Sequence, residues 1–581
     1  MSTNTGYDRR EFMGYFASIG LGSTLLPGVL WAKAVNGEEI NASAIACAEE
    51  IAGLKFDDAE REMMVDGLKT QAARIEALHK IPLANSVAPA IIFNPRPAKA
   101  IKSAATRGKM SRSRVAIPRR PANLEDLAFE PVTVLSEMIR RRVVTPTELT
   151  RMYLARLRKY DPQLLAVITL TEERALAQAR VLDAELARGK YRGPLHGIPW
   201  GAKDLLAVKG YKTTWGAGPY KNQVIDEDAT VVQRLDAAGA ILVAKLTLGE
   251  LAQGDIWFGG TTKNPWKLDQ GSSGSSAGPA AAVSAGLVGF TIGSETLGSI
   301  SSPSTRVGVT GLRPTFGRVP RTGAMALSWT MDKLGPLCRS AEDCALVLDA
   351  IYGPDGLDPT VADEPFHWNA NIDIRNLRIG YFKTAFDLPL TDPKDEKRTL
   401  HFTKPFDDAA LATLRKLGLK LIPVDVPDIP YDPMRIILTA EAAAAFDELT
   451  RTDRDKELVQ QGKFDWANTF RTARFIPAVD YINANRLRTL AVAKWDELFS
   501  KVDVIVSPTS AANLAQLVAT NLTGQPAVIL PHGFRADGTP VSLTFLAGLY
   551  KEAELIAVAS AYQRATDFHL RHPTMTPVKP A

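Results

Sequence analysis

The stretch from Gly271 to Ser299, GSSGSSAGPAAAVSAGLVGFTIGSETLGS, decides how this sequence is interpreted. A Gly/Ser cluster lies at each end, and the segment between the clusters is almost entirely apolar. A flexible linker would continue into polar residues, so this composition favours two turns on either side of a buried segment. A phosphate-binding loop would end in Gly-Lys-Ser/Thr, which does not occur here. The question is then which of these serines carry out chemistry.

The overall composition is that of an ordinary globular protein. The chain has 581 residues, of which 45% are hydrophobic and 23% charged, and its net charge of +5 argues against a nucleic-acid-binding protein. From Arg96 to Arg120 it has nine Lys/Arg and no acidic residue, which predicts a solvated connector or, alternatively, contact with an anionic surface. The three cysteines cannot form a disulfide framework, and Cys338 and Cys344 have no nearby histidine pair for a zinc site.

The N-terminus resembles a twin-arginine export signal. Arg9-Arg10 precedes an apolar, glycine-rich run from Phe12 to Trp31, and Ala32-Lys33-Ala34 follows as a small-x-small cleavage pattern. An uncleaved membrane anchor is the alternative, which Pro27 and the glycines weaken. No other stretch approaches about 18 uninterrupted apolar residues, so we expect no stable membrane insertion once residues 1–34 are removed. The sequence thus predicts a periplasmic or extracellular protein.

Two further segments follow. Residues 35–123 are expected to form a helical extension and the basic connector, with Asp57 and Glu60 as a capping box. Residues 124–575 alternate helical and strand patterns: Thr145 and Glu148 begin a helix, and the apolar runs 164–170 and 240–245 are typical of buried strands. This pattern predicts an α/β fold with a large mixed, mainly parallel β-sheet covered by helices on both faces.

One catalytic interpretation is the nucleophile elbow of the α/β-hydrolases. Residues 274–278, GSSAG, match G-x-S-x-G with Ser276 as the nucleophile. The elbow must follow a buried strand, and the preceding residues 263–273, KNPWKLDQGSS, predict no strand. Its downstream histidine would be His532, which has an apolar context. The elbow therefore remains an alternative that lacks its preceding strand.

Several separated motifs resemble the amidase signature family. They are GPLHGIPWGAKDLL (193–206), GSSAGPAAAVSAG (274–286), GSETLGSIS (293–301), GLRPTFGRVPRTG (311–323), DKLGP (332–336) and NLTGQPAVILPHGF (521–534). The resemblance extends over roughly residues 125–570, and the motifs occur in the order that the family shows. It implies the amidase signature fold.

The resemblance implies a catalytic triad of Lys203, Ser275 and Ser299. Ser299 would be the nucleophile, Ser275 a proton relay behind a cis Gly274–Ser275 peptide bond, and Lys203 the base. A serine hydroxyl needs such a base, and a lysine serves only when neutral. Its ordinary pKa is about 10.4, which burial lowers, so this mechanism requires a buried Lys203.

The resemblance also places the oxyanion hole at the backbone N–H groups of Thr296, Leu297, Gly298 and Ser299. Ser276 and Glu295 are expected to support the triad. The family usually has two glycines before the nucleophile, and Leu297 here tolerates a positive φ poorly, so either its φ is negative or it narrows the site. Ser301 stands where the family usually has arginine, so Glu295 needs another partner.

The implied function is an amidohydrolase for linear, non-peptide amides that works through an acyl-enzyme. The resemblance implies no metal and no organic cofactor, and its partner is a small-molecule amide rather than nucleic acid; it leaves a homodimer open. Two alternatives remain. One is the glutaminase (A) subunit of a tRNA-dependent amidotransferase, and the other is a catalytically inactive binding protein with the same fold.

Overall fold

The computed structural model describes residues 40–83, 90–91, 110–509 and 514–576. The chain forms two compact units: one joins the described residues up to Ile91 with Pro430–Leu490, and the other joins Ile92–Ile429 with Ala491–Ala581. The predicted export signal, residues 1–34, lies outside the described residues. The division of the sequence into segments 1–34, 35–123 and 124–575 stays a prediction.

The smaller unit consists of helices. They are α3 (Ala42–Ala52), α4 (Asp58–His79), α14 (Ile436–Ala445), α15 (Asp447–Arg451), α16 (Trp466–Ala473) and the start of α17 (Ala478–Lys501). The predicted capping box is confirmed: Asp57 accepts from the Glu60 N–H, and the Glu60 carboxylate accepts from the Asp57 N–H. Helix α4 packs against α3 and α16 around a core that includes Ile45, Met64 and Leu68.

The larger unit is built on one sheet of eleven strands. Their spatial order is β1 (Val167–Leu170), β3 (Ile241–Leu246), β2 (Pro199–Lys203), β8 (Phe290–Glu295), β10 (Lys333–Cys338), β9 (Thr310–Arg313), β16 (Ala527–Phe534), β17 (Pro540–Ala547), β15 (Val504–Pro508), β11 (Ile379–Phe382) and β14 (Leu421–Val424). The predicted large mixed α/β sheet is confirmed.

The share of parallel pairs is smaller than predicted. Strand β2 runs parallel to β3 and β8, and β11 runs parallel to β14 and β15, whereas the other six neighbouring pairs are antiparallel. Strands β16 and β17 are buried along nearly their whole length although they are antiparallel. Apolar runs in the sequence indicate a strand that is buried on both faces. Such burial is usual for parallel strands but also occurs in antiparallel ones.

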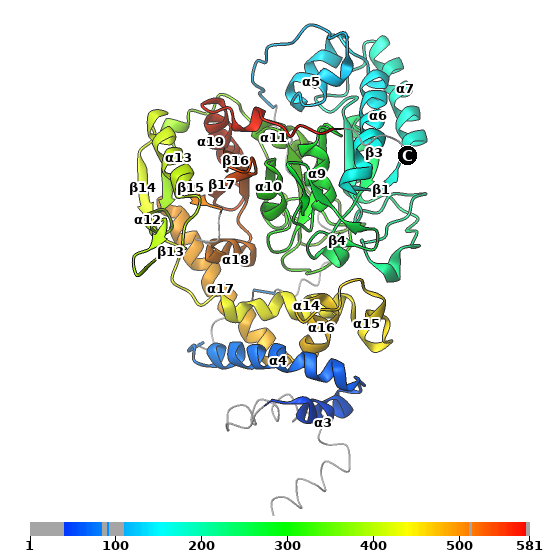
Figure 1. The fold of residues 1–581 in the computed structure, drawn as a ribbon. Coiled ribbons are helices and arrows are strands. Elements are labelled where there is room, and N and C mark those ends of the chain that lie inside the picture. Colours follow the sequence, from blue (N-terminus) through cyan, green and yellow to red (C-terminus); the bar gives the residue numbers. More distant parts are fainter. Residues whose placement is uncertain (1–39, 84–89, 92–109, 510–513, 577–581) are drawn as a thin grey trace, which may run out of the picture. The chain divides into compact units, whose positions relative to one another are not determined.

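Two pairs of helices pack on the central strands (Figure 1). Helices α9 (Ala277–Ser284) and α10 (Ser301–Val307) contact each other and strands of the β8–β17 region, and α11 (Ala341–Ile351) and α19 (Glu552–Arg564) do the same as a second pair. The remaining helices are α5 (Val132–Arg140), α6 (Pro146–Leu164), α7 (Glu172–Ala187), α8 (Thr230–Ala238), α12 (Lys383–Asp387), α13 (Lys404–Lys416) and α18 (Leu514–Thr523). No described helix combines the length and apolar character needed to cross a membrane.

Local predictions in this unit are mostly met. The capping box of Thr145 and Glu148 begins α6, and the run 240–245 forms the fully buried β3. The run 164–170 is a shorter and only half-buried strand, because Leu164 still belongs to α6 and β1 lies at the edge of the sheet.

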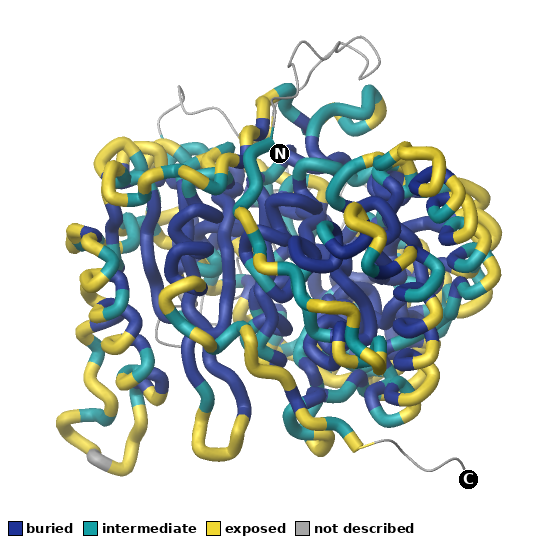
Figure 2. The backbone as a smooth tube through the Cα atoms, turned by 90° about the horizontal axis from the view of Figure 1, so that it is seen from above, coloured by how far each residue is buried: buried dark blue, intermediate teal, exposed yellow. Residues whose placement is uncertain are grey.

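The quoted stretch adopts the arrangement that its composition predicts. The first Gly/Ser cluster forms a turn, α9 follows with all its residues buried, β8 is a fully buried inner strand of the sheet, and the second cluster leads into α10. Figure 2 shows how completely the central strands are buried between their helices. Both Gly/Ser turns therefore flank buried elements of one sheet-and-helix core.

Candidate active site

The amine of Lys203 is the centre of a buried cluster of serines. Lys203 ends β2, and its side chain is fully buried. Its Nζ donates to Ser275 Oγ at 2.8 Å, to Ser294 Oγ at 2.8 Å and to Ser276 Oγ at 3.2 Å. The structure thus brings Lys203 and Ser275 together, and it buries the lysine as the mechanism requires.

The three hydroxyls suit either protonation state of the amine. An ammonium donates three hydrogen bonds, whereas a neutral amine donates two and accepts one. The Ser276 hydroxyl donates to the Ser294 carbonyl oxygen at 3.1 Å, so it can only accept from the amine. Within the described residues the Ser275 hydroxyl bonds only to Lys203, so its proton can point at a neutral amine. The Ser294 hydroxyl also bonds only to Lys203 in the described chain, so Ser275 and Ser294 are the two hydroxyls that can deliver a proton to the amine, and the resemblance assigns that role to Ser275.

The environment of Lys203 favours the neutral amine. Burial lowers its pKa to about 7, although the negative charges of Asp332 and Glu295 oppose the change. At neutral pH a substantial fraction of the molecules then carries an uncharged amine, whereas an exposed lysine would be almost fully protonated. The site therefore supplies a base that works near neutral pH.

The turn before α9 brings Ser299 close through the main chain. The Gly274–Ser275 peptide bond is cis, as the resemblance implies, and the Ser276 N–H donates to the Ser299 carbonyl oxygen at 3.0 Å. A Cβ on Gly293 would come within 2.6 Å of Ser276 Oγ, so this glycine makes room for the cluster. The Ser299 hydroxyl forms no hydrogen bond to the described residues. A hydrogen bond between the Ser275 and Ser299 side chains is therefore part of the proposed mechanism and not of the observed geometry.

The loop before Ser299 offers unpaired backbone donors. Within the described part of the chain, no acceptor bonds to the four N–H groups from Thr296 to Ser299. Leu297 keeps a negative φ, and the positive φ of +92° falls on Gly298, where glycine tolerates it. The departure at Leu297 thus creates no backbone strain, and its N–H stays available for an oxyanion.

The ion-pair partner of Glu295 is Arg313, in place of the arginine that is missing at position 301. Its carboxylate accepts from the Arg313 guanidinium at 2.9 Å, from Asn521 Nδ2 at 2.8 Å and from Ser301 N and Oγ, both at 2.8 Å. Burial opposes ionisation of Glu295, but Arg313, Lys333 and the Ser301 N–H together outweigh this effect, and the pKa of Glu295 lies at about 2. Arg313 on β9 therefore supplies the charge that position 301 lacks, and the Glu295 carboxylate ties the start of α10 to β9.

Replacing Arg313 with methionine is expected to lower the free energy of unfolding by about 3–5 kcal/mol, because Glu295 would remain buried without its ion-paired partner. Replacing Arg120 with methionine breaks a partly exposed pair with Glu148 and should cost less than about 1 kcal/mol. Urea unfolding of the two variants measures the difference. Equal losses would mean that the Arg313–Glu295 pair does not hold the core at this point.

A cavity of about 470 Å³ adjoins the cluster. Ser294 and Thr296 line it, together with apolar side chains such as Met325 and Trp329. Asp332 also lines it and accepts from Thr296 Oγ1 at 2.6 Å, so it holds the start of the oxyanion loop. The cavity is mainly apolar and is a candidate substrate pocket.

Ser294, Asp332 and Arg313 were not among the residues predicted from the sequence. Ser294 and Asp332 lie inside the motifs GSETLGSIS and DKLGP, so the motifs could have marked them as candidate site residues. Their contacts with Lys203 and Thr296 depend on strand pairing, which the motifs alone do not reveal.

The nucleophile-elbow alternative does not fit the geometry. A short strand, β7 (Lys267–Gly271), does precede Ser276, contrary to the sequence prediction, but it pairs only with β6 (Lys263–Asn264) in a separate hairpin. The Ser276 hydroxyl bonds to Lys203 and Ser294, and His532 bonds to Asp407 at 2.7 Å. Ser276 and His532 therefore have other partners, and Ser276 supports the amine instead.

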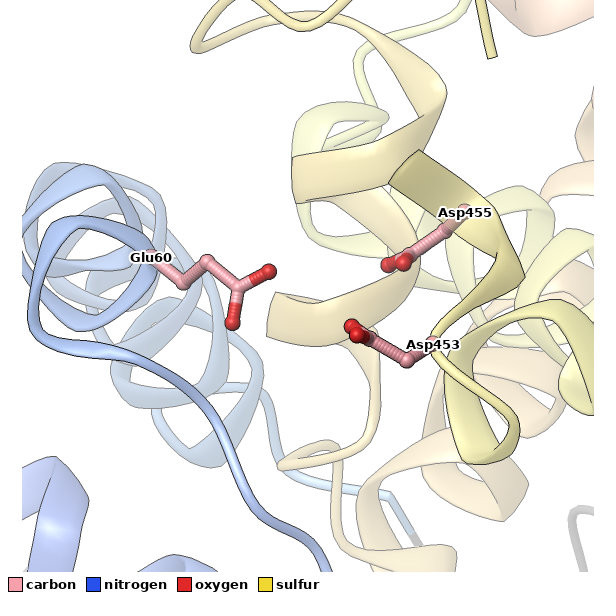
Figure 3. A group of neighbouring side chains, drawn as sticks. All are labelled: Glu60, Asp453 and Asp455. Atoms are coloured by element: carbon pink, nitrogen blue, oxygen red, sulfur yellow. The ribbon is translucent and has the colours of Figure 1, made fainter. Parts of the chain in front are cut away.

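One group of carboxylates among the described residues is close enough to hold a cation. Glu60, Asp453 and Asp455 converge in the smaller unit (Figure 3). Arg471 pairs with Glu60 and Asp455, both at 2.9 Å, and Lys456 lies 3.1 Å from Asp453. Two basic side chains thus already neutralise much of this group, and nothing there points to a ligand.

Comparison with known proteins gives a consistent picture. The Amidase family model matches residues 148–556, which include every residue of the serine cluster. The chain is 34% identical to the A subunit of glutamyl-tRNA(Gln) amidotransferase from Marinomonas sp. (strain MWYL1) over 77% of this chain and 99% of that protein. It is 35% identical to the corresponding protein of Roseiflexus sp. (strain RS-1) over 76% of this chain and 97% of that protein. The solved peptide amidase from Stenotrophomonas maltophilia is 30% identical, with a TM-score of 0.65 over 75% of this chain and 97% of that one.

Proposed function

The chain belongs to the amidase family, and we propose that it is an amidohydrolase that cleaves a small-molecule carboxylic amide through Lys203, Ser275 and Ser299. The observation that carries this proposal is the buried Lys203 amine, which lies 2.8 Å from the Ser275 hydroxyl. The unpaired N–H groups before Ser299 add the donors that acyl transfer requires. Linear, non-peptide amides are the proposed substrates.

The proposed mechanism moves one proton along the three side chains. Ser299 Oγ attacks the amide carbonyl carbon while its proton passes to Ser275 Oγ, whose own proton passes to neutral Lys203. The oxyanion forms against the N–H groups of residues 296–299. Return of the proton through Ser275 to the amide nitrogen breaks the C–N bond and releases the amine. Water then attacks the acyl-enzyme by the same proton route and releases the acid.

A panel of amides tests the proposal. Aliphatic, aryl and peptide C-terminal amides are incubated with the protein, and release of amine or ammonia is measured. Added hydroxylamine should divert part of the product to a hydroxamate, because it attacks an acyl-enzyme in place of water. If no member of the panel releases amine or ammonia, the result counts against an amidohydrolase.

The rate should depend on pH through Lys203. We expect kcat/KM for a neutral amide to rise about tenfold per pH unit below an apparent pKa of about 7 and to level off above it, because only the neutral amine accepts a proton. Initial rates between pH 5 and 9, with circular dichroism to confirm folding, give the profile. A rate that falls steadily from pH 6 to 9 in folded protein would contradict a lysine base.

A second candidate function is the glutaminase subunit of a tRNA-dependent amidotransferase. Its support is the identity of 34–35% to proteins of that name over three quarters of this chain. We rank it lower because the sequence also carries a predicted export signal, which a cytoplasmic complex would not need. Glutamine hydrolysis that depends on tRNA and on added amidotransferase partners would reverse the ranking.

Export remains part of the proposal and rests on the sequence alone. The Arg9-Arg10 pair and the apolar run after it support a twin-arginine signal. Cell fractionation of the wild type and of the double variant Arg9→Lys, Arg10→Lys separates the outcomes. Export that survives the substitution would argue against this signal.

A further inference from the structure

A second cavity, of about 380 Å³, borders the other end of the oxyanion loop. Ser302 and Leu517 line it. A Cβ added at Gly298 would lie 3.1 Å from Ser302 Oγ and 3.4 Å from Leu517 Cδ2, so this cavity is next to the loop. Thr296, at the start of the loop, lines the first cavity instead. Residues at the two ends of the loop from 296 to 299 thus border different cavities, Thr296 the first and the neighbours of Gly298 the second.

The second cavity carries a concentration of positive charge. Three arginines line it, Arg306, Arg313 and Arg535. Arg313 is paired with Glu295 inside the core. In the described parts of the chain, no carboxylate lies within ion-pairing distance of the other two. The nearby acidic residue, Asp537, is paired with Lys267 at 3.5 Å.

Arg306 and Arg535 lie close enough to influence each other. Partial burial lowers the pKa of Arg535, Asp537 opposes this, and the charge of Arg306 lowers it further. The Arg535 guanidinium stacks over the Phe402 ring at 4.3 Å, which restricts its position. Two neighbouring guanidinium groups that lack an ion-paired carboxylate repel each other, and an anion bound between them would lower the free energy of the cavity.

The rest of the lining suits a small oxyanion. It is mostly neutral and polar, with hydroxyls and amides from Gln270, Ser302, Thr305, Gln516 and Thr539. An arginine side chain presents its N–H groups in a planar fork that matches the two oxygens of a carboxylate. The cavity thus combines charge, hydrogen-bond donors and proximity to the nucleophile loop.

We propose that this cavity binds a carboxylate of the substrate, so that the enzyme acts on amides that carry an apolar group on one side of the scissile bond and a carboxylate on the other. This inference rests on the proposed amidohydrolase function and narrows its substrate class. The apolar cavity takes one side of the amide, and Arg306 and Arg535 bind the charged side.

Matched substrate pairs test the inference and locate the charge. N-benzoylglycine carries its carboxylate on the amine side and is compared with uncharged N-isobutylbenzamide. Succinanilic acid carries it on the acyl side and is compared with 4-methylpentananilide. We expect kcat/KM of the charged member to exceed that of its partner by about tenfold or more in one pair. Equal rates within both pairs, with amide hydrolysis intact, overturn the inference and leave the proposed function standing.

Variants assign the effect to the two arginines. The double variant Arg306→Gln, Arg535→Gln should lose the preference for the charged member, and the Arg306→Lys, Arg535→Lys variant should keep part of it. Lys267→Gln, which removes a paired cation from the same surface, should keep the full preference. Retention of the full preference in the double glutamine variant contradicts the assignment.

Binding measurements keep the inference separate from catalysis. Calorimetry with the full chain carrying Ser299→Ala should detect N-benzoylglycine or succinanilic acid and show at least tenfold weaker binding of the uncharged partner. If no amide is hydrolysed but this difference appears and depends on Arg306 and Arg535, the proposed function fails and the anion site stands. Equal binding of charged and uncharged members refutes the site.

Discussion

Replacing Ser299 with alanine is expected to lower kcat for amide hydrolysis by at least about 10⁴-fold, because it removes the oxygen that attacks the amide carbonyl in the proposed mechanism. Ser275 and Ser276 are both bonded to the Lys203 amine and cannot take its place. Substrate binding should change little, since the hydroxyl contributes mainly to the transition state. Initial rates on the best amide of the panel give kcat and KM separately.

Covalent labelling distinguishes this outcome from an inactive protein that merely keeps the fold. A fluorophosphonate probe should label the wild type once per chain, and intact-mass analysis should show no label in the Ser299→Ala variant. Ser500→Ala is the control, because Ser500 is an exposed residue of α17 and should leave labelling and rate unchanged. An unlabelled wild type would favour a binding protein, and a labelled Ser299→Ala variant would place the nucleophile elsewhere.

The sequence predicted features that depend on local composition or on long motifs. The two turns of the quoted stretch, the buried α9 and β8 between them and the capping boxes of α4 and α6 are all present. Each depends on residues a few positions apart, so local physical rules suffice to predict it.

Features that depend on distant contacts were not predicted. Arg313 compensates for Ser301 from a different strand, and the pairing of β9 with β10 and β16 that places it there leaves no local signal. The joining of residues 40–91 with 430–490 in one unit is of the same kind. The antiparallel share of the sheet was underestimated because apolar runs such as β3 were interpreted as typical of parallel strands, whereas antiparallel strands such as β16 are buried just as deeply.

Two buried lysines on neighbouring strands should respond in opposite ways to the same substitution. Lys203 on β2 is surrounded by hydroxyls, whereas Lys245 on β3 forms a fully buried ion pair with Asp204 at 2.6 Å. Replacing Lys203 with methionine should abolish hydrolysis, with a loss of at least about 10³-fold in kcat, because it removes the base. Replacing Lys245 with methionine should reduce the amount of folded protein instead, by leaving the Asp204 carboxylate buried without its partner, at a cost of about 3–5 kcal/mol.

The Lys203→Met variant should also be more stable than the wild type at neutral pH. A pKa of about 7 in the folded state, against about 10.4 when unfolded, means that the folded protein binds fewer protons between these values. The cost to the wild type is therefore largest at pH 7 and below, about 3–5 kcal/mol, and disappears as the pH rises towards 10. The lost hydrogen bonds to the serines offset about 1–3 kcal/mol of the gain.

Urea unfolding of wild type, Lys203→Met and Lys245→Met at pH 7 and at pH 9.5 tests both statements together. At pH 7 we expect Lys203→Met to unfold at a higher urea concentration than the wild type, and Lys245→Met at a lower one. At pH 9.5 the advantage of Lys203→Met should shrink or reverse, because removing the proton from the wild-type lysine costs less free energy as the pH approaches the unfolded-state pKa of about 10.4. If Lys203→Met is instead less stable than the wild type by the same amount at both pH values, the amine is charged in the folded protein, and neither the base nor the relay through Ser275 can work as proposed.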